Sequence, residues 1–163
     1  MGLAMNAQPI LFTLARVLDE QRLEAVLIGN AAAALQGAPV TTVDFDFLFR
    51  KTPTNIRKLK AIAKSLGAML LRPYYPASGL YRITRDDDQL QLDFMGRIDG
   101  VRSIEGMRRR ASRMDMGGHA LLVASLADII RSKRAAGRPR DQAVLEILEK
   151  VLHETTQAEN DKK

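Results

Sequence analysis

The stretch "TTVDFDFLFR" (Thr41–Arg50) combines the pattern of a buried strand with two acidic side chains. Hydrophobic residues occupy every second position from Val43 to Phe49, as expected for one face of a strand. Asp44 and Asp46 lie between them. A carboxylate in a largely buried strand loses hydration, which costs several kcal/mol unless a cation or hydrogen-bond donors replace the water. The stretch therefore predicts a strand that is built to hold positive charge.

Side chains on a strand repeat every two residues, so Asp44 and Asp46 should project from the same face, within reach of one cation or a close pair. Asp93 lies in the later segment "LQLDFM", which has the same alternating pattern and could supply a third carboxylate. Oxygen ligands of this kind suit Mg²⁺ or Mn²⁺, especially when nucleotide phosphates complete the coordination. An Asp-x-Asp pair on an ordinary exposed strand is the alternative interpretation.

A second feature lies just upstream, in "LIGNAAAALQG" (residues 27–37). The segment reads as a strand, a glycine and a helix, which would place free backbone N–H groups near Gly29 and Asn30. Phosphate could bind there, or Asn30 could simply cap the helix. No Gly-Lys-Ser/Thr follows, so the segment is not a Walker P-loop.

Composition sets limits on the function. The 163 residues fit one domain, and the absence of cysteine excludes disulfides, thiolate zinc sites and a cysteine nucleophile. The net charge of +6 favours a polyanionic partner such as RNA, DNA or nucleotide phosphates, although an ordinary solvated surface explains it equally well. No apolar run approaches the roughly 20 residues of a membrane span, and the N-terminus lacks a signal-peptide pattern. We therefore expect a cytoplasmic protein with no membrane partner.

The remaining patterns predict helices alternating with strands, and hence an α/β (α+β) domain with a small mixed twisted sheet flanked by helices. Strands are expected within 24–29, 41–50, 68–75, 80–85 and 90–95, and Gly117-Gly118 predicts a second hairpin. The domain should cover residues 1–152, with a core over about 24–124. A C-terminal helix pair should occupy about 125–152 (helices 126–136 and 141–152). The polar segment 153–163 is expected to be a disordered tail.

The strand with "IGN", the following helix, "TTVDFDFLF" and the later "LQLDF" together resemble the nucleotidyltransferase superfamily that includes DNA polymerase β and kanamycin nucleotidyltransferase. The C-terminal "SLADIIRSKRAAGRPRDQAVLEIL" (residues 125–148) is similar to AbiEii/AbiGii-type nucleotidyltransferases of bacterial toxin systems. The resemblance implies a nucleotidyltransferase fold. It also implies transfer of a nucleoside monophosphate (NMP) from a nucleoside triphosphate (NTP) to a hydroxyl, with two Mg²⁺ ions.

The resemblance also implies roles for residues in the first part of the chain. Gly29 and Asn30 would hold the triphosphate, and Thr42 would support the site. Asp44 and Asp46 would bind the two metal ions. Asp93 would share one metal ion and help to deprotonate the attacking hydroxyl.

In the C-terminal part, Lys133 and Arg138 would neutralise phosphate charge, and Asp141 would orient Arg138. Helix capping and surface ion pairs are an alternative explanation for these three residues. By resemblance to the toxin-type relatives, the expected acceptor is RNA, with a tRNA end as the leading hypothesis, and a cognate partner protein is a further expected partner.

Three positions depart from the family pattern. Asn30 stands where glycine or serine is usual, and Val40 stands where many relatives have arginine. Val144 stands where the toxin-type relatives often have a second aspartate. An asparagine can still donate a hydrogen bond to phosphate. The departures leave one alternative function open, a catalytically weakened module with this fold that binds nucleic acid or a partner protein.

Overall fold

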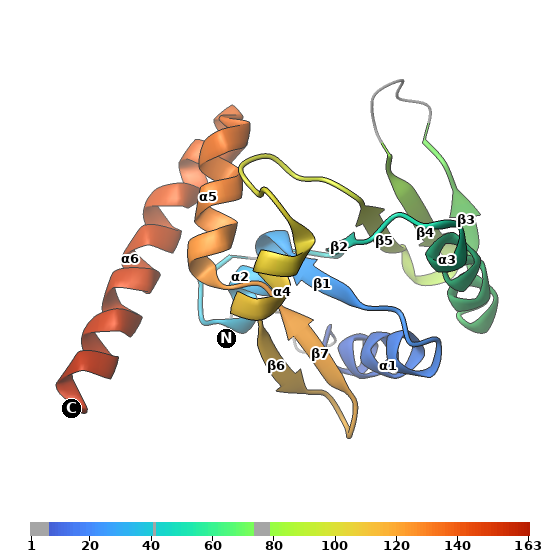
Figure 1. Cartoon of the computed structure of the whole chain (residues 1–163), viewed down its shortest axis with the longest axis horizontal. Helices are drawn as coiled ribbons and strands as arrows, with labels where there is room; N and C mark the ends of the chain where they lie inside the picture. The colour runs from blue at the N-terminus through green and yellow to red at the C-terminus, as the bar shows by residue number, and fades with distance from the viewer. Residues whose placement is uncertain (1–6, 41, 74–78) are drawn as a thin grey trace.

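The computed structural model describes residues 7–40, 42–73 and 79–163. Their strands form one mixed seven-stranded sheet in the order β3-β4-β5-β2-β1-β7-β6, shown in Figure 1. The strands are β1 (Ala25–Ile28), β2 (Asp44–Phe49), β3 (Met69–Leu71), β4 (Tyr81–Arg85), β5 (Leu90–Met95), β6 (Ser112–Asp115) and β7 (Ala120–Val123). The predicted fold class, a mixed sheet flanked by helices, is confirmed. The strand expected over 68–75 is the shorter β3, and Tyr74 and Tyr75 lie outside the described residues.

The helices follow the periodic segments of the sequence. They are α1 (Ala7–Glu20), α2 (Gly29–Leu35), α3 (Pro53–Ser65), α4 (Ile104–Arg110), α5 (Leu126–Ala136) and α6 (Pro139–Asp161), and a 3₁₀ turn, η1 (Asp86–Asp88), joins β4 to β5. Helix α3 has a well-defined start, because the Thr52 side chain accepts a hydrogen bond from the Asn55 N–H and Pro53 opens the first turn. Helix α1 contacts α3 and β7, whereas α5 packs on α2 and α6.

Strand β2 is at the centre of the sheet, antiparallel to β1 and parallel to β5. Its phenylalanines form the core on one face, where the rings of Phe47 and Phe94 stack with centroids 5.0 Å apart. Val43 shares their alternation in the sequence but lies before the strand and is 76% exposed. The buried phenylalanines fix the register of β2, so its aspartates must project from the opposite face.

The C-terminal helices form the expected pair but extend further than predicted. Gly137 adopts a left-handed conformation (φ 63°) that ends α5, and α6 then runs from Pro139 to Asp161. The predicted disordered tail is therefore wrong for residues 153–161, although every residue from His153 onward is exposed. Neither glycine nor proline follows Pro139, so no strong helix-breaking residue interrupts α6 after its packed first half.

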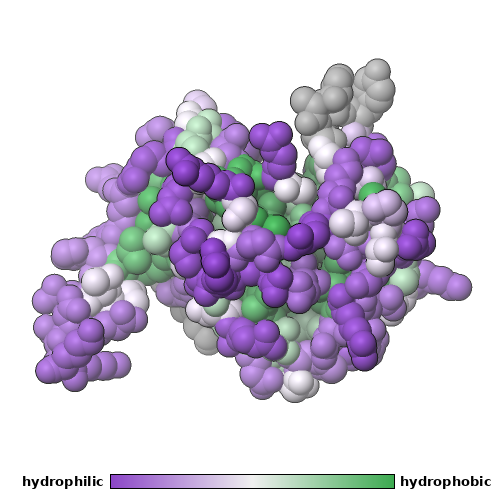
Figure 2. Space-filling model, in the orientation of Figure 1, coloured by the Kyte–Doolittle hydropathy of each residue, from purple (hydrophilic) through white to green (hydrophobic). Residues whose placement is uncertain are grey.

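Hydrophilic side chains cover most of the face seen in Figure 2, and apolar residues show along the seam between α5 and α6. Among the described residues, no helix has both the length and the apolar character needed to cross a membrane.

Candidate active site

The acidic face of β2 is the starting point of the candidate site. Asp44 is exposed at the first position of the strand, and Asp46 is half-buried two residues later. Thr42 fixes the backbone at the start of β2. Its hydroxyl donates to the Asp44 carbonyl (3.0 Å) and accepts from the Asp44 N–H (3.2 Å). Thr42 therefore acts on the backbone that positions Asp44.

Asp46 lies where three strands meet. It is opposite Ile28 on β1 and opposite Asp93 on β5, so the registers place the second and third aspartates of the predicted set on adjacent strands. Gly29 directly follows β1 and approaches Asp46 closely. A Cβ at this glycine would be 3.1 Å from Oδ2 of Asp46, and the φ of +68° also favours glycine. The glycine predicted for phosphate binding thus also leaves room for the acidic side chain.

The environment of Asp46 favours its protonated form. Burial of the carboxyl, followed by the negative charges of Asp93 and Asp44, raises the pKa of Asp46 to about 6. The positive charges of Lys133 and Arg82 lower this pKa but do not cancel the increase. A carboxyl in this state is one whose charge a bound cation would stabilise, because the cation would oppose both causes of the shift.

Asp93 is buried and carries an ion pair that was not predicted from the sequence. Arg82 of β4 donates from Nε to Oδ1 of Asp93 (2.8 Å) and from Nη2 to Oδ2 (3.1 Å). The two residues are opposite each other in the β4–β5 hairpin. The "DDDQ" turn could have predicted this pair, since a loop over residues 86–89 pairs Arg85 with Leu90 and hence Arg82 with Asp93. Arg82 fixes the orientation of Asp93 toward the acidic face.

Three predicted residues meet at the junction of α5 and α6. Arg138 donates from Nε to Oδ2 of Asp141 (2.6 Å), and Nζ of Lys133 lies 3.5 Å from Oδ1. The Asp141 carboxylate is buried, the Lys133 side chain is 12% exposed, and the Arg138 side chain is 50% exposed. Burial lowers the pKa of Lys133, and the negative charges of Asp141 and Asp46 oppose that decrease. Lys133 is thus the cation of this pair whose charge acts on Asp46.

Asn30 lies in the first turn of α2 and does not cap the helix. The cap position is Ile28, and no side chain caps it. Oδ1 of Asn30 is buried and has no hydrogen-bond partner among the described residues. Rotating the Asn30 amide by about 180° would place Nδ2 at the position of Oδ1. The side chain can therefore offer either a hydrogen-bond acceptor or a donor to a substrate.

The donor set fits a divalent cation only in part. Two carboxylates on one face of β2 and a third across the sheet are the oxygen ligands that Mg²⁺ prefers. Yet no group of three or more acidic or histidine side chains within the described parts of the chain is close enough to hold a metal ion. Arg82 engages both oxygens of Asp93, which leaves Asp44 and Asp46 as the more available ligands.

The pKa of Asp46 predicts a pH-dependent effect of the substitution Asp46→Asn on stability. A raised pKa in the folded state means that ionisation of Asp46 disfavours folding. Its cost is therefore absent below pH about 4 and complete above pH about 7. In the absence of divalent cations, Asp46→Asn should be more stable than the wild type by about 2–3 kcal/mol at pH 7.5 and nearly equal to it at pH 4. Urea unfolding of both proteins across this range measures the difference. A difference that stays constant with pH would contradict the shifted pKa.

A glycine packed against an Asp-x-Asp strand, a third aspartate on the parallel neighbour and a mixed sheet flanked by helices together define a nucleotidyltransferase. The chain belongs to the family described as nucleotidyl transferase of unknown function (DUF2204), whose model matches residues 7–163. The prediction of a nucleotidyltransferase is therefore confirmed. No curated protein matches the chain significantly.

Solved structures share the fold at low sequence identity. A candidate nucleotidyltransferase from Thermotoga maritima is 17% identical with a TM-score of 0.59, over 99% of this chain and 96% of that one. ANT(2")-Ia in complex with adenylyl-2"-tobramycin is 16% identical with a TM-score of 0.61, over 98% and 100% of the two chains. The lincosamide antibiotic adenylyltransferase LnuA, bound to lincomycin, is 10% identical with a TM-score of 0.63, over 93% and 99%.

Proposed function

We propose that this nucleotidyltransferase is metal-dependent and transfers an NMP from an NTP to a hydroxyl at the acidic face of β2. The observation that carries the proposal is the surroundings of Asp46. Its half-buried carboxyl has a raised pKa beside Asp44 and Asp93, Gly29 is packed against it, and Lys133 is within electrostatic reach. A solvated pair on an ordinary strand would not gather these groups around one carboxyl.

Asp44 and Asp46 would hold Mg²⁺ or Mn²⁺, with Asp93 as a further ligand. Bound metal of this kind stabilises the charge on the entering and departing oxygens. The backbone at Gly29, the amide of Asn30 and the ammonium group of Lys133 would bind the triphosphate. Arg138 is more exposed than Lys133 and shares Asp141 with it, so it would contribute less to this binding.

In the proposed reaction, the acceptor oxygen forms a bond to the α-phosphorus of the NTP. The bond from that phosphorus to the oxygen bridging to the β-phosphate breaks, and pyrophosphate leaves with the electron pair. The hydroxyl proton passes to a carboxylate of the site, for which Asp93 is the candidate. Each carboxylate oxygen has two lone pairs, so Asp93 can accept this proton while Arg82 keeps it oriented.

RNA is the proposed acceptor, with a tRNA end as the leading form. The surplus of 25 basic over 19 acidic residues and the C-terminal resemblance to AbiEii/AbiGii-type toxins support this choice. A small antibiotic hydroxyl is the competing acceptor, because ANT(2")-Ia and LnuA are antibiotic-modifying neighbours in fold. A cognate partner protein in a toxin-antitoxin-like system belongs to the same proposal.

The second candidate function is a module of the same fold that binds nucleic acid or protein without turnover. The ion pair between Arg82 and Asp93 favours it, because a guanidinium occupies both oxygens of the third carboxylate. Val40 and Asn30 also depart from the active pattern.

Thermal unfolding with ligands separates the two functions. Mg²⁺ or Mn²⁺ together with an NTP should raise the melting temperature of the wild type, since a ligand bound only by the folded state stabilises it. Ligand at a concentration of about 100 times its Kd should raise the free energy of unfolding by about 2.7 kcal/mol. Asp44→Asn should lose most of this gain, whereas Asp87→Asn in the exposed η1 turn should keep it. The metal-dependent proposal fails if no NTP produces a metal-dependent shift in the wild type.

A further inference from the structure

A pocket opens at the opposite end of β1 from the acidic site. Its volume is about 480 Å³, and it lies among α1, α3, α4 and the paired strands β1, β6 and β7. Ala25, at the start of β1, pairs with Phe49, and Arg50 follows directly on the pocket wall. Arg50 lies four residue steps after Asp46, which corresponds to about 13 Å of extended chain.

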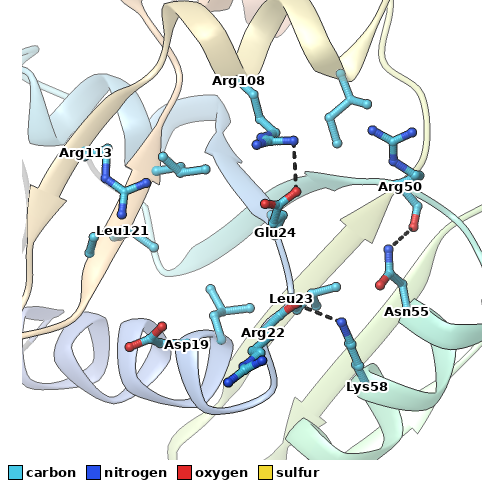
Figure 3. Close-up of a pocket in the computed structure, with 15 residues that line it drawn as sticks. Asp19, Arg22, Leu23, Glu24, Arg50, Asn55, Lys58, Arg108, Arg113 and Leu121 are labelled. Carbon is cyan, nitrogen blue, oxygen red and sulfur yellow. Dashed lines mark hydrogen bonds and ion pairs between the residues drawn. The ribbon is translucent and has the colours of Figure 1, made fainter.

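Cationic side chains from five separate segments line this pocket, and Figure 3 shows them arranged around Glu24. They are Arg22 after α1, Arg50 after β2, Lys58 of α3, Arg108 of α4 and Arg113 of β6. Two carboxylates, Asp19 and Glu24, also line it, so five positive and two negative charges leave a surplus of three. The convergence of five chain segments distinguishes this pocket from a run of charge along one exposed helix.

The ion pairs neutralise only part of this charge. Arg108 pairs with Glu24 (2.8 Å), and Arg50 pairs with Glu105 of α4. Within the described ranges, neither Arg22 nor Arg113 has a carboxylate within ion-pair distance. These two arginines are therefore available to a bound anion.

Arg22 also has a backbone conformation that an arginine rarely adopts. Its φ is +52°, at the turn that ends α1, where the Leu23 N–H donates to the Leu18 carbonyl (2.9 Å). Glycine is the usual residue in this helix-ending conformation, and a larger side chain there is strained. Such strain at a pocket is typical of a residue whose side chain has a role in binding.

We propose that this pocket binds the sugar–phosphate backbone of a single-stranded RNA, an inference that rests on the proposed RNA acceptor. Cations spread around the rim suit successive phosphates, as in an electrostatic groove for a single strand. The residues that line the pocket include no aromatic side chain, so it offers no platform for stacking a base. An RNA held here could run along the surface toward the acidic site and present its terminal hydroxyl.

The test is binding of a labelled single-stranded RNA, measured by fluorescence anisotropy across a salt series without NTP or divalent cations. The double variant Arg22→Gly/Arg113→Ala should bind at least about tenfold more weakly than the wild type at low salt. Its slope of log affinity against log salt should be shallower by about 1.4, at about 0.7 for each lost phosphate contact. Because glycine relieves the strain at position 22, its melting temperature should not fall below that of Arg22→Ala/Arg113→Ala.

The matched control is Lys64→Ala/Lys150→Ala, which removes two exposed charges from α3 and α6 outside the pocket. Its affinity should stay within about twofold of the wild type. Equal weakening of both double variants, or unchanged binding in the pocket variant, would overturn the proposal. So would binding of tripolyphosphate in the pocket without binding of RNA. Asp46→Asn should bind RNA normally, so a failure of NMP transfer alone would leave this inference intact.

Discussion

Replacing Asp46 with asparagine is expected to reduce NMP transfer by at least about 10³-fold while making the metal-free protein more stable at neutral pH. Asparagine keeps the shape of the side chain but cannot carry the charge that would hold a cation and oppose the phosphate charge in the transition state. The same change removes a carboxylate that burial and two neighbouring aspartates make costly to ionise. Activity and stability should therefore change in opposite directions at this one residue.

The measurement is transfer of labelled NMP at saturating Mg²⁺, together with the melting temperature in a chelating buffer. Asp87→Asn is the control, because Asp87 is exposed in the η1 turn. It should retain the activity and the stability of the wild type. If Asp46→Asn loses activity because it unfolds, the expected gain in stability is wrong. If Asp46→Asn keeps full activity, the reaction takes place at another site.

The second large effect is expected at Lys133. Replacement by methionine preserves the packing of the stem but removes the charge. The transition state should lose about 2–4 kcal/mol of stabilisation, equivalent to about 30- to 1000-fold in transfer rate. The Lys133 side chain is 12% exposed, and its charge lowers the pKa of Asp46. A cation so placed can meet a phosphate that approaches Asp46.

Arg138→Met is the matched comparison, because Arg138 contacts the same Asp141 from a half-exposed position. We expect a loss below about tenfold there, since the Arg138 guanidinium is half-exposed and solvent and salt screen its charge. Steady-state kinetics with varied NTP measures both variants, and thermal unfolding checks that each is folded. Equal losses of transfer rate in Lys133→Met and Arg138→Met would contradict the prediction that the buried cation contributes more than the half-exposed one.

The centre of the fold could be predicted because its signals are local. Alternating phenylalanines identified β2, and a glycine pair located the β6–β7 turn. The C-terminal end of α6 was predicted to be disordered because its residues are polar, as they are in disordered segments. That prediction did not weigh helix propensity, which the absence of glycine and proline raises here.

The aspartates of the candidate site could be identified from alternation alone, whereas their partners depended on strand register. Arg82 stands opposite Asp93 only when the β4–β5 hairpin is closed at residues 86–89. The pocket around Arg22 and Arg113 joins residues about 90 positions apart across several elements, and no local pattern predicts such a meeting.

Transfer of label from NTPs labelled separately at the α- and γ-phosphates tests the central claim most directly. The folded protein would be incubated with each of the four NTPs, Mg²⁺ and total RNA, and the RNA, protein and small-molecule fractions would be counted. We predict that the α-label enters the RNA fraction in a metal-dependent reaction, that the γ-label leaves as pyrophosphate, and that Asp46→Asn abolishes transfer. Label confined to protein or small molecules would refute the RNA acceptor. Transfer of the γ-label, or no transfer by folded wild type to any fraction, would contradict nucleotidyl transfer at this site.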